Sequence, residues 1–285
     1  MPELPEVETM RRGIKAVTGA TIVSAIRTPC KKKPIEISPP VNQLQKRIVG
    51  RKIVAVERLG KRVVVRLDTV DRLIFEPRMT GLVLIEDPPG GEHLRFQMRL
   101  KGATVDELLF WDRRGLGRIE LLSDEEYQAK LTSGKLGPDA LDISEAEFPS
   151  RFNSSGRAIK VAMLDQSTVA GIGNIYAAEI LHLARVHPAL PCNRVKDSVW
   201  PDIFRHMRDV LITAIKYEGS TLSDGTYRNA LNEKGGYQNE HRVYDREGEA
   251  CRQCKRGIIK RIVQAQRSTF FCPSCQPMIA LRKKK

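Results

Sequence analysis

The sequence lacks several features that would assign it to common classes of protein. Its 285 residues contain no run of about 18 apolar residues, which excludes a typical transmembrane helix and predicts no membrane partner. The first residues are acidic and include no apolar stretch, so we expect no signal peptide. We find no internal repeat, and the length is typical of about two domains. Together these absences predict a cytoplasmic protein.

Acidic residues are scarce relative to basic ones, and the C-terminal end has none. The chain contains 48 Lys and Arg against 34 Asp and Glu, a net charge of +14. From Cys251 to Lys285 there are ten basic residues and no acidic one. This distribution predicts a polyanionic partner such as nucleic acid. A basic but otherwise ordinary protein is the alternative.

Cysteine is used sparingly, and four of the six cysteines are grouped. Cys30 and Cys192 are isolated, and no role is assigned to them. The other four have the spacing C-x2-C-x17-C-x2-C: Cys251, Cys254, Cys272 and Cys275. Two CxxC pairs can place four thiolates around one tetrahedral Zn²⁺, and such a closed site is structural rather than catalytic. Two disulfides are the alternative, although nothing indicates an oxidising compartment.

The hydrophobic pattern predicts an α+β, multidomain protein. Val7, Met10, Ile14 and Val17 recur at helical spacing, and Gly19 ends this helix. Short β-branched runs follow, a pattern typical of a β-sandwich or barrel. The predicted strands are Thr21–Ile26, Ile53–Val56, Val63–Leu67, Leu73–Phe75, Leu82–Ile85, Leu94–Met98, Thr104–Phe110 and Arg118–Leu122.

Helices are predicted in the second half of the chain. The clearest are Ile175–Arg185 and Ser198–Tyr217, and a polar, Gly-rich loop follows at Thr221–Glu240. The predicted organisation is a β-sandwich domain (2–122), a crossing region (123–150), a helical domain with its loop at about 219–240 (151–240), a zinc finger (241–278) and a basic tail (279–285).

Proline at position 2 offers unusual chemistry if Met1 is removed. The chain would then begin with a secondary amine, and a free α-amino group titrates near pH ~8. Such an amine can attack an electrophilic carbon and form an iminium ion. Glu3 and Glu6 are near enough to transfer protons. The alternative is that Pro2 only favours removal of Met1 and that the acids suit a helix N-terminus.

Two further stretches indicate contact with nucleic acid. Gly171-Ile172-Gly173-Asn174 lies where a turn opens a helix, and free N–H groups there suit a phosphate. Asn174 could equally cap that helix. Asp112-Arg113-Arg114-Gly115-Leu116-Gly117 joins arginines to an apolar residue that could wedge into a duplex, as could Met79. Burial in the core is the simpler interpretation for Met79 or Leu116 alone.

These motifs, in this order, resemble the formamidopyrimidine-DNA glycosylase family, the bacterial repair enzymes for oxidised purines. The resemblance covers nearly the whole chain: PELPEVET at the start, Lys61 on an early strand, D-x-R-x-x-G, GIGNIYA, and a zinc module reading QRSTFFCPSCQ. It implies a β-sandwich with an N-terminal helix, a helix-two-turn-helix domain and a zinc-finger β-hairpin.

The resemblance implies catalytic roles for five residues. Pro2 would attack C1′ of the damaged nucleotide, and Glu3 would act as general acid/base at the sugar ring. Glu6 would belong to the same acidic cluster. Lys61 would contact phosphate near the lesion and assist β-elimination. Arg267, on the zinc hairpin, would bind the phosphates beside the flipped nucleotide and take part in δ-elimination.

The resemblance also implies DNA contacts. Asn174 would bind phosphate and His93 would touch DNA. Met79, Arg114 and Leu116 would fill the vacated base stack. The stretch Thr221–Glu240 would be the loop that caps the extruded base.

The chain departs from the family at three places. The family reads H-L-G-M-S-G where this chain has Glu76-Pro77-Arg78-Met79-Thr80-Gly81, and a family phenylalanine is Leu116 here. A family lysine before the GIGN helix falls on Ser155, which leaves the nearby Arg157 as the expected DNA contact. These changes bear on opposite-base discrimination and duplex affinity.

The expected function is that of a monomeric, bifunctional DNA glycosylase and AP lyase in the bacterial cytoplasm, associated with the nucleoid. Its substrates would be 8-oxoguanine and formamidopyrimidines in damaged double-stranded DNA, and its only cofactor would be one structural Zn²⁺. Three alternatives stay open. They are an endonuclease VIII-like glycosylase for oxidised pyrimidines, a non-catalytic zinc-stabilised protein that binds DNA lesions, and a zinc-ribbon protein bound to structured RNA.

Overall fold

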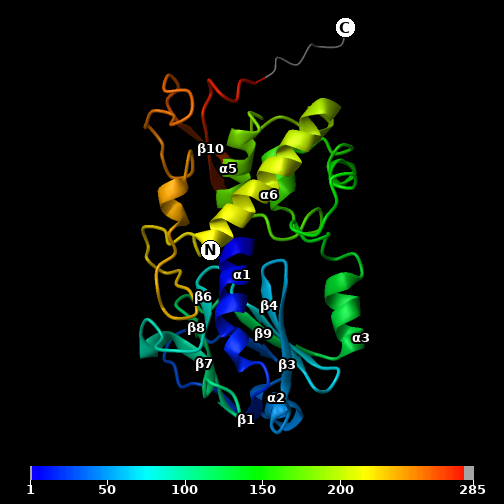
Figure 1. Cartoon of the computed structure of the whole chain (residues 1–285), viewed down its shortest axis with the longest axis vertical. Helices are drawn as coiled ribbons and strands as arrows, with labels where there is room; N and C mark the ends of the chain where they lie inside the picture. The colour runs from blue at the N-terminus through cyan, green and yellow to red at the C-terminus, as the bar shows by residue number, and fades with distance from the viewer. Residues whose placement is uncertain (1, 279–285) are drawn as a thin grey trace. The chain divides into compact units, whose positions relative to one another are not determined.

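The computed structural model describes residues 2–278 and divides into two compact units (Figure 1). The first comprises Met1–Lys135 and Ala214–Gln238, and the second comprises Leu136–Thr213 and Asn239–Lys285. The polar stretch assigned above to the helical domain is thus grouped, up to Gln238, with the N-terminal part of the chain. The expected basic tail, 279–285, lies outside the described residues.

The first unit contains two β-sheets around one apolar core. One sheet has the order β1 (Thr21–Arg27), β7 (Leu94–Lys101), β8 (Glu107–Asp112), β6 (Gly81–Leu84). The other has the order β2 (Glu36–Ser38), β9 (Arg118–Leu122), β5 (Arg72–Glu76), β4 (Arg62–Leu67), β3 (Ile53–Leu59). Only β2 and β9 pair in parallel. Every predicted strand is present and both sheets contribute to the core, which confirms the predicted fold class.

The N-terminal helix lies on this core. Helix α1 spans Leu4–Gly13 and continues as a 3₁₀ turn over Ile14–Val17. Its apolar side chains, spaced three or four residues apart, are fully buried, and it packs against β3, β4 and β6. Pro5 in the first turn suits the helix start, since its missing N–H would have no partner there. The helix thereby fixes the position of Pro2.

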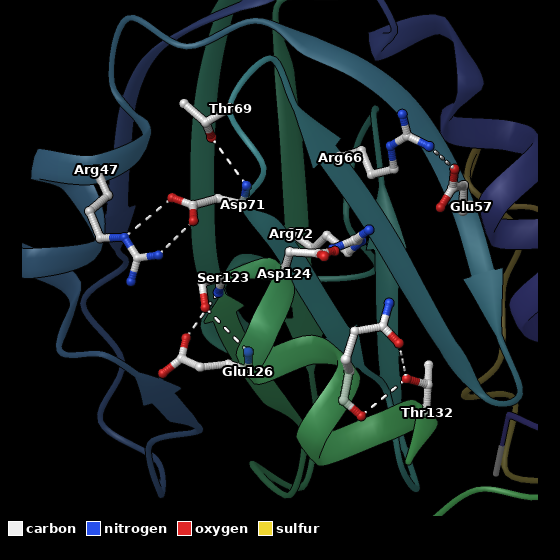
Figure 2. Close-up of polar contacts among 11 residues, drawn as sticks. Arg47, Glu57, Arg66, Thr69, Asp71, Arg72, Ser123, Asp124, Glu126 and Thr132 are labelled. Atoms are coloured by element: carbon white, nitrogen blue, oxygen red, sulfur yellow. Dashed lines mark hydrogen bonds and ion pairs between the residues drawn. The ribbon is translucent and has the colours of Figure 1, made fainter. Parts of the chain in front are cut away.

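Two short helices pack against strands of the two sheets, one against β1 and β2 and the other against β9. Helix α2 (Val41–Ile48) precedes β3, and Arg47 on it pairs with Asp71 at 2.7 Å. Helix α3 (Asp124–Tyr127) and a π-helical turn (Gln128–Thr132) follow β9, so the expected crossing region begins with helix. Figure 2 shows Ser123 and Glu126 forming a capping box at the start of α3, while Arg72 of β5 pairs with Asp124.

The second unit is mainly helical and ends in a two-stranded hairpin. Its main elements are α4 (Ile159–Leu164), α5 (Asn174–Leu183), α6 (Trp200–Lys216), β10 (Lys260–Gln264) and β11 (Arg267–Phe271), of which α6 continues from Ala214 into the first unit. Short 3₁₀ turns lie at Pro149–Arg151, Cys192–Arg194, Asp197–Val199 and Tyr237–Glu240. In its interior Phe152 stacks on Trp200, and Phe148 packs against both rings. Within residues 2–278, no helix has both the length and the apolar character that crossing a bilayer requires.

Candidate active site and nucleic-acid interface

Two buried glutamates organise the start of α1. Glu3 and Glu6 are 0% and 1% exposed, and they form a reciprocal capping box in which each side chain accepts from the other's backbone N–H. The Glu3 amide donates to Glu6 Oε2 at 2.8 Å, and the Ser220 amide donates to Glu6 Oε1 at 2.8 Å. Glu6 therefore ties the N-terminal segment to residues 219–238, and we infer that it positions other groups rather than reacting itself.

Glycine is required where this segment meets Glu6. Gly219 has φ +78°, and a Cβ built on it would lie 2.8 Å from Glu6 Oε1. Neither the left-handed backbone nor the close approach suits a larger residue. Sequence reading missed Gly219 and Ser220, because nothing local marks a contact with a residue more than 200 positions away.

Pro2 lines a small cavity closed by the same segment. The cavity, of ≈ 10 Å³, is bordered by Pro2, Met79, Ser220 and Tyr227, among others. The Tyr227 hydroxyl donates to Glu218 O at 3.0 Å. Burial, together with the charge of Glu6, raises the pKa of Tyr227 well above its usual value, so this donor stays protonated. The space holds about one water, so a nucleotide does not fit beside Pro2 in this conformation.

The predicted wedge residues lie on two turns that share a hydrogen-bond network. The buried Asp112 carboxylate accepts from the Thr80 hydroxyl, from Arg114 N at 3.2 Å and from Gly117 N at 2.7 Å. Because Thr80 follows Met79, this network joins the turn of Met79 to the turn of Arg114 and Leu116. Arg114 itself is exposed and Leu116 is half-buried. Asp112 is thus an organising residue whose role was not assigned from the sequence.

Arg78 keeps a backbone conformation that glycine favours. Its φ is +53°, in the left-handed region, at the position where the family pattern has glycine. Its side chain is paired with Glu76 at 3.5 Å. The departure at Glu76-Pro77-Arg78 therefore keeps a left-handed residue before Met79 and adds an ion pair between Arg78 and Glu76.

Lys61 and His93 lie at other edges of the first unit. Lys61 was expected on a strand, but it lies in the turn between β3 and β4, so the expectation was wrong by one residue. Strand β3 is held to α1 by Arg58, whose Nε is 3.3 Å from Glu8 Oε2. His93 ends a 3₁₀ turn, and its ring meets Trp111 edge-on at 5.3 Å.

In the second unit, the start of α5 is joined to the zinc hairpin. Asn174 Nδ2 donates to Ser268 O at 3.0 Å, and its Oδ1 accepts from Lys160 Nζ. Lys160, on α4, is fully buried. Sequence reading missed this lysine and named Arg157, which is exposed and paired with Asp165 at 2.8 Å. A single lysine in the apolar run 159–164 is the signal that could have found it.

Arg267 begins β11 directly after a tight turn. Ala265 and Gln266 both have positive φ, +46° and +60°, as in a type I′ hairpin turn. The usual signal for such a turn is Asn-Gly, which is why the sequence did not mark it. Arg267 is exposed and faces no acidic partner among the described residues. Arg267 therefore offers an exposed cation suited to phosphate, next to Ser268, whose carbonyl accepts from Asn174.

The four predicted zinc ligands come together behind this hairpin. All four Sγ atoms lie within 4.8 Å of one another, and Cys251–Cys275 and Cys254–Cys272 are both separated by 3.8 Å. A tetrahedral Zn²⁺ with Zn–S bonds of ~2.3 Å gives S···S distances of about 3.8 Å. The distances are far too long for disulfides. The donor set therefore fits one structural Zn²⁺, as predicted.

Two residues of α5 support this module. Buried Glu179 accepts hydrogen bonds from Arg242 N, Val243 N and Tyr244 N at 2.9–3.0 Å. His182 Nε2 lies 3.5 Å from Cys251 Sγ. Burial lowers the pKa of His182 to about 4, so it is a neutral imidazole that can donate to the thiolate. Neither residue was identified from the sequence.

Comparison with known proteins places this arrangement in one family. Residues 1–119 match the formamidopyrimidine-DNA glycosylase N-terminal domain, residues 136–226 its H2TH domain, and residues 248–277 the zinc finger found in FPG and IleRS. Formamidopyrimidine-DNA glycosylase of Chloroflexus aurantiacus is 37% identical over 279 residues, covering 97% of this chain and 98% of that protein. The Thermus thermophilus enzyme of the same name is 37% identical, with the same coverage.

Solved structures support the same family assignment. The MutM (Fpg) protein from Thermus thermophilus superposes with a TM-score of 0.84 at 35% identity, covering 96% of this chain and 98% of that one. The complex between Lactococcus lactis Fpg and DNA containing an abasic site gives 0.84 at 32% identity, covering 97% and 100%. The chain belongs to the formamidopyrimidine-DNA glycosylase family. It is a DNA-binding glycosylase of base excision repair.

Proposed function

We propose that the protein removes oxidised purines, namely 8-oxoguanine and formamidopyrimidines, from duplex DNA and then nicks the strand. The proposal rests on two observations: the buried Glu6 carboxylate accepts from the Glu3 and Ser220 amides, and Pro2 borders a small cavity together with Ser220. A secondary amine there, freed by removal of Met1, is a suitable nucleophile.

The proposed chemistry uses one amine twice. The Pro2 nitrogen attacks C1′, the damaged base leaves, and Glu3 moves a proton at the opening sugar ring. The resulting iminium acidifies the C2′ proton, whose loss expels the 3′ phosphate. A second elimination expels the 5′ phosphate. No redox cofactor takes part, and the zinc only stabilises the hairpin that carries Arg267.

The remaining residues bind and deform DNA. Lys61 and Arg267 hold phosphates beside the extruded nucleotide, and Asn174 with Lys160 binds a further phosphate. Met79, Arg114 and Leu116 fill the gap in the stack, which is how a base can be held outside a duplex. His93 and Arg157 remain proposed DNA contacts. We further propose that the protein acts as a monomer in the bacterial cytoplasm, at the nucleoid.

Product analysis tests this function. Duplexes carrying either one 8-oxoguanine opposite cytosine or one oxidised pyrimidine would be incubated with the protein, and the cut ends identified by mass. We expect preferential cutting at 8-oxoguanine, with phosphates left on both sides of a one-nucleotide gap. Preference for the pyrimidine would favour the endonuclease VIII-like alternative. Tight binding without cleavage would favour the non-catalytic one.

A further inference from the structure

A second cavity lies in the second unit, beyond the C-terminal end of α5. Its volume is ≈ 290 Å³, near the lower end of the range of small ligand pockets. The buried side chains of Val186, Leu190 and Val195 line its interior. Arg185, Arg194 and Lys196, all exposed, form its rim. We call this the basic apolar pocket. Its combination of apolar interior and cationic rim suits an amphipathic anion.

The rim carries uncompensated positive charge. None of the residues lining the pocket is acidic. Within the described part of the chain, none of the three rim cations forms an ion pair. Cations above a low-dielectric wall concentrate their field at the opening and attract anions. Two other exposed arginines of this unit, Arg157 and Arg205, are instead paired with carboxylates.

One rim residue occupies a strained position. Arg185 follows the C-cap of α5 and has φ +56°, where glycine is the usual residue. A non-glycine residue in this conformation is strained. The helix dipole favours a cation at this end of α5. The dipole of α5 does not account for Arg194 and Lys196, which lie on a separate segment and line the same opening.

The pocket is distinct from the proposed phosphate site. Asn174 begins α5, whereas Arg185 lies just beyond its other end, 11 residues later. At ~1.5 Å per residue, about 16 Å of helix separates them. A phosphate bound by Asn174 and Lys160 therefore does not reach the rim. A duplex backbone would also gain nothing from the apolar interior.

We propose that the basic apolar pocket binds an acidic segment of a partner protein, with one apolar side chain in the interior and carboxylates at the rim. Arginine clusters that recognise acidic motifs are a recurrent mode of peptide recognition. The chain's own residues 279–285 include four cations and no acid, so their charge matches the rim instead of complementing it. The pocket serves recruitment and is independent of the proposed chemistry at Pro2.

Fluorescence anisotropy with the full chain tests this proposal. The probe is a fluorescein-labelled peptide of six aspartates with one central leucine. We expect the substitutions Arg185→Gly and Arg194→Gln together to raise its Kd at least tenfold. Arg185→Gly also relieves the strained backbone, so misfolding would not explain the loss. Arg205→Gln, which removes an exposed cation of α6 outside the pocket, should change the Kd less than twofold.

Two further arms separate the proposal from general charge attraction. Replacing the peptide's leucine with serine should weaken binding about tenfold, and 8-oxoguanine excision by the double variant should match that of the unaltered protein. Equal binding of both peptides, no binding of either, or no effect of the pocket substitutions would overturn the proposal. Loss of duplex affinity in the double variant would show that the pocket is a DNA contact instead.

Discussion

Pro2 and Arg267, the two residues at the centre of the proposed chemistry, are held in place by different means. Pro2 precedes a helix that is packed on the large core of two sheets and fixed by the carboxylate of Glu6. Arg267 lies on a hairpin whose core, among the described residues, has a small set of buried members: Ala178, Val243, Ile259, Phe270, Cys251 and Cys272. The first region relies on apolar burial and backbone hydrogen bonds, and the second relies on metal coordination.

This comparison explains why the hairpin that carries Arg267 has a structural zinc site. A hairpin this small buries too little apolar surface to remain folded alone. Zinc coordination by the four thiolates must therefore supply the missing stabilisation. The N-terminal segment is held instead by hydrogen bonds to a buried carboxylate, which contribute about 1.5–3 kcal/mol each. We therefore expect zinc chelation to unfold the hairpin, and substitution beside Glu6 to destabilise the N-terminal segment.

Zinc removal should have the largest effect. Chelation should abolish binding to lesion-containing DNA, since the hairpin with Arg267 loses its fold while the β-sheets keep theirs. Hydrogen exchange followed by mass spectrometry would show loss of protection over 250–275 and unchanged protection in β4 and β5. Simultaneous loss of protection throughout the chain would contradict the comparison.

Gly219→Ala tests the first region. Both Gly219 and Gly225 have positive φ, but only a Cβ at Gly219 meets Glu6, whereas one at Gly225 meets nothing within 4 Å. Each alanine should cost about 1 kcal/mol of backbone strain. Gly219→Ala should cost a further ~1–3 kcal/mol by disturbing the Glu6 hydrogen bonds, and should slow excision. Denaturant unfolding and single-turnover rates would measure this, and equal losses in the two variants would argue against a positioning role for Glu6.

Arg267→Ala should weaken DNA binding while leaving the amine intact. Loss of a charge-assisted phosphate contact should raise the Kd about 10–100-fold and reduce the salt slope of binding by about 0.9. Pro2 should still react with a free abasic sugar at the normal rate. Gln266→Ala, at the neighbouring turn position, is the control. Unchanged affinity for Arg267→Ala would remove its assigned role.

The smallest effect concerns Glu8 of α1. Burial disfavours its charge, but hydrogen bonds from Arg11 and Arg12 outweigh burial and hold the pKa of Glu8 below its usual value. Its contribution to stability should thus be present above the unfolded pKa of ~4.3 and be lost as pH falls through the lower folded value. Denaturant unfolding at several pH values would show a shallower acid decline for Glu8→Gln. Identical slopes would indicate that Glu8 does not stabilise α1.

Much of this could be predicted from the sequence because its signals are local. The cysteine spacing predicted the zinc site, β-branched runs predicted the strands, and three-residue spacing predicted α1. Contacts between distant residues could not be predicted in this way. Ser220 meets Glu6, Thr80 meets Asp112 and Lys160 meets Asn174 only after the chain has folded. Arg78 and Arg185 keep left-handed backbones without the glycine that would mark them.

Borohydride trapping tests the central claim most directly. The protein would be incubated with a duplex carrying one 8-oxoguanine opposite cytosine, reduced, digested and mapped by mass spectrometry. A reduced cross-link on the Pro2 nitrogen is predicted, and a chain retaining Met1 should give none. A cross-link on a lysine, or no cross-link when the Pro2 amine is confirmed to be free, would contradict the account.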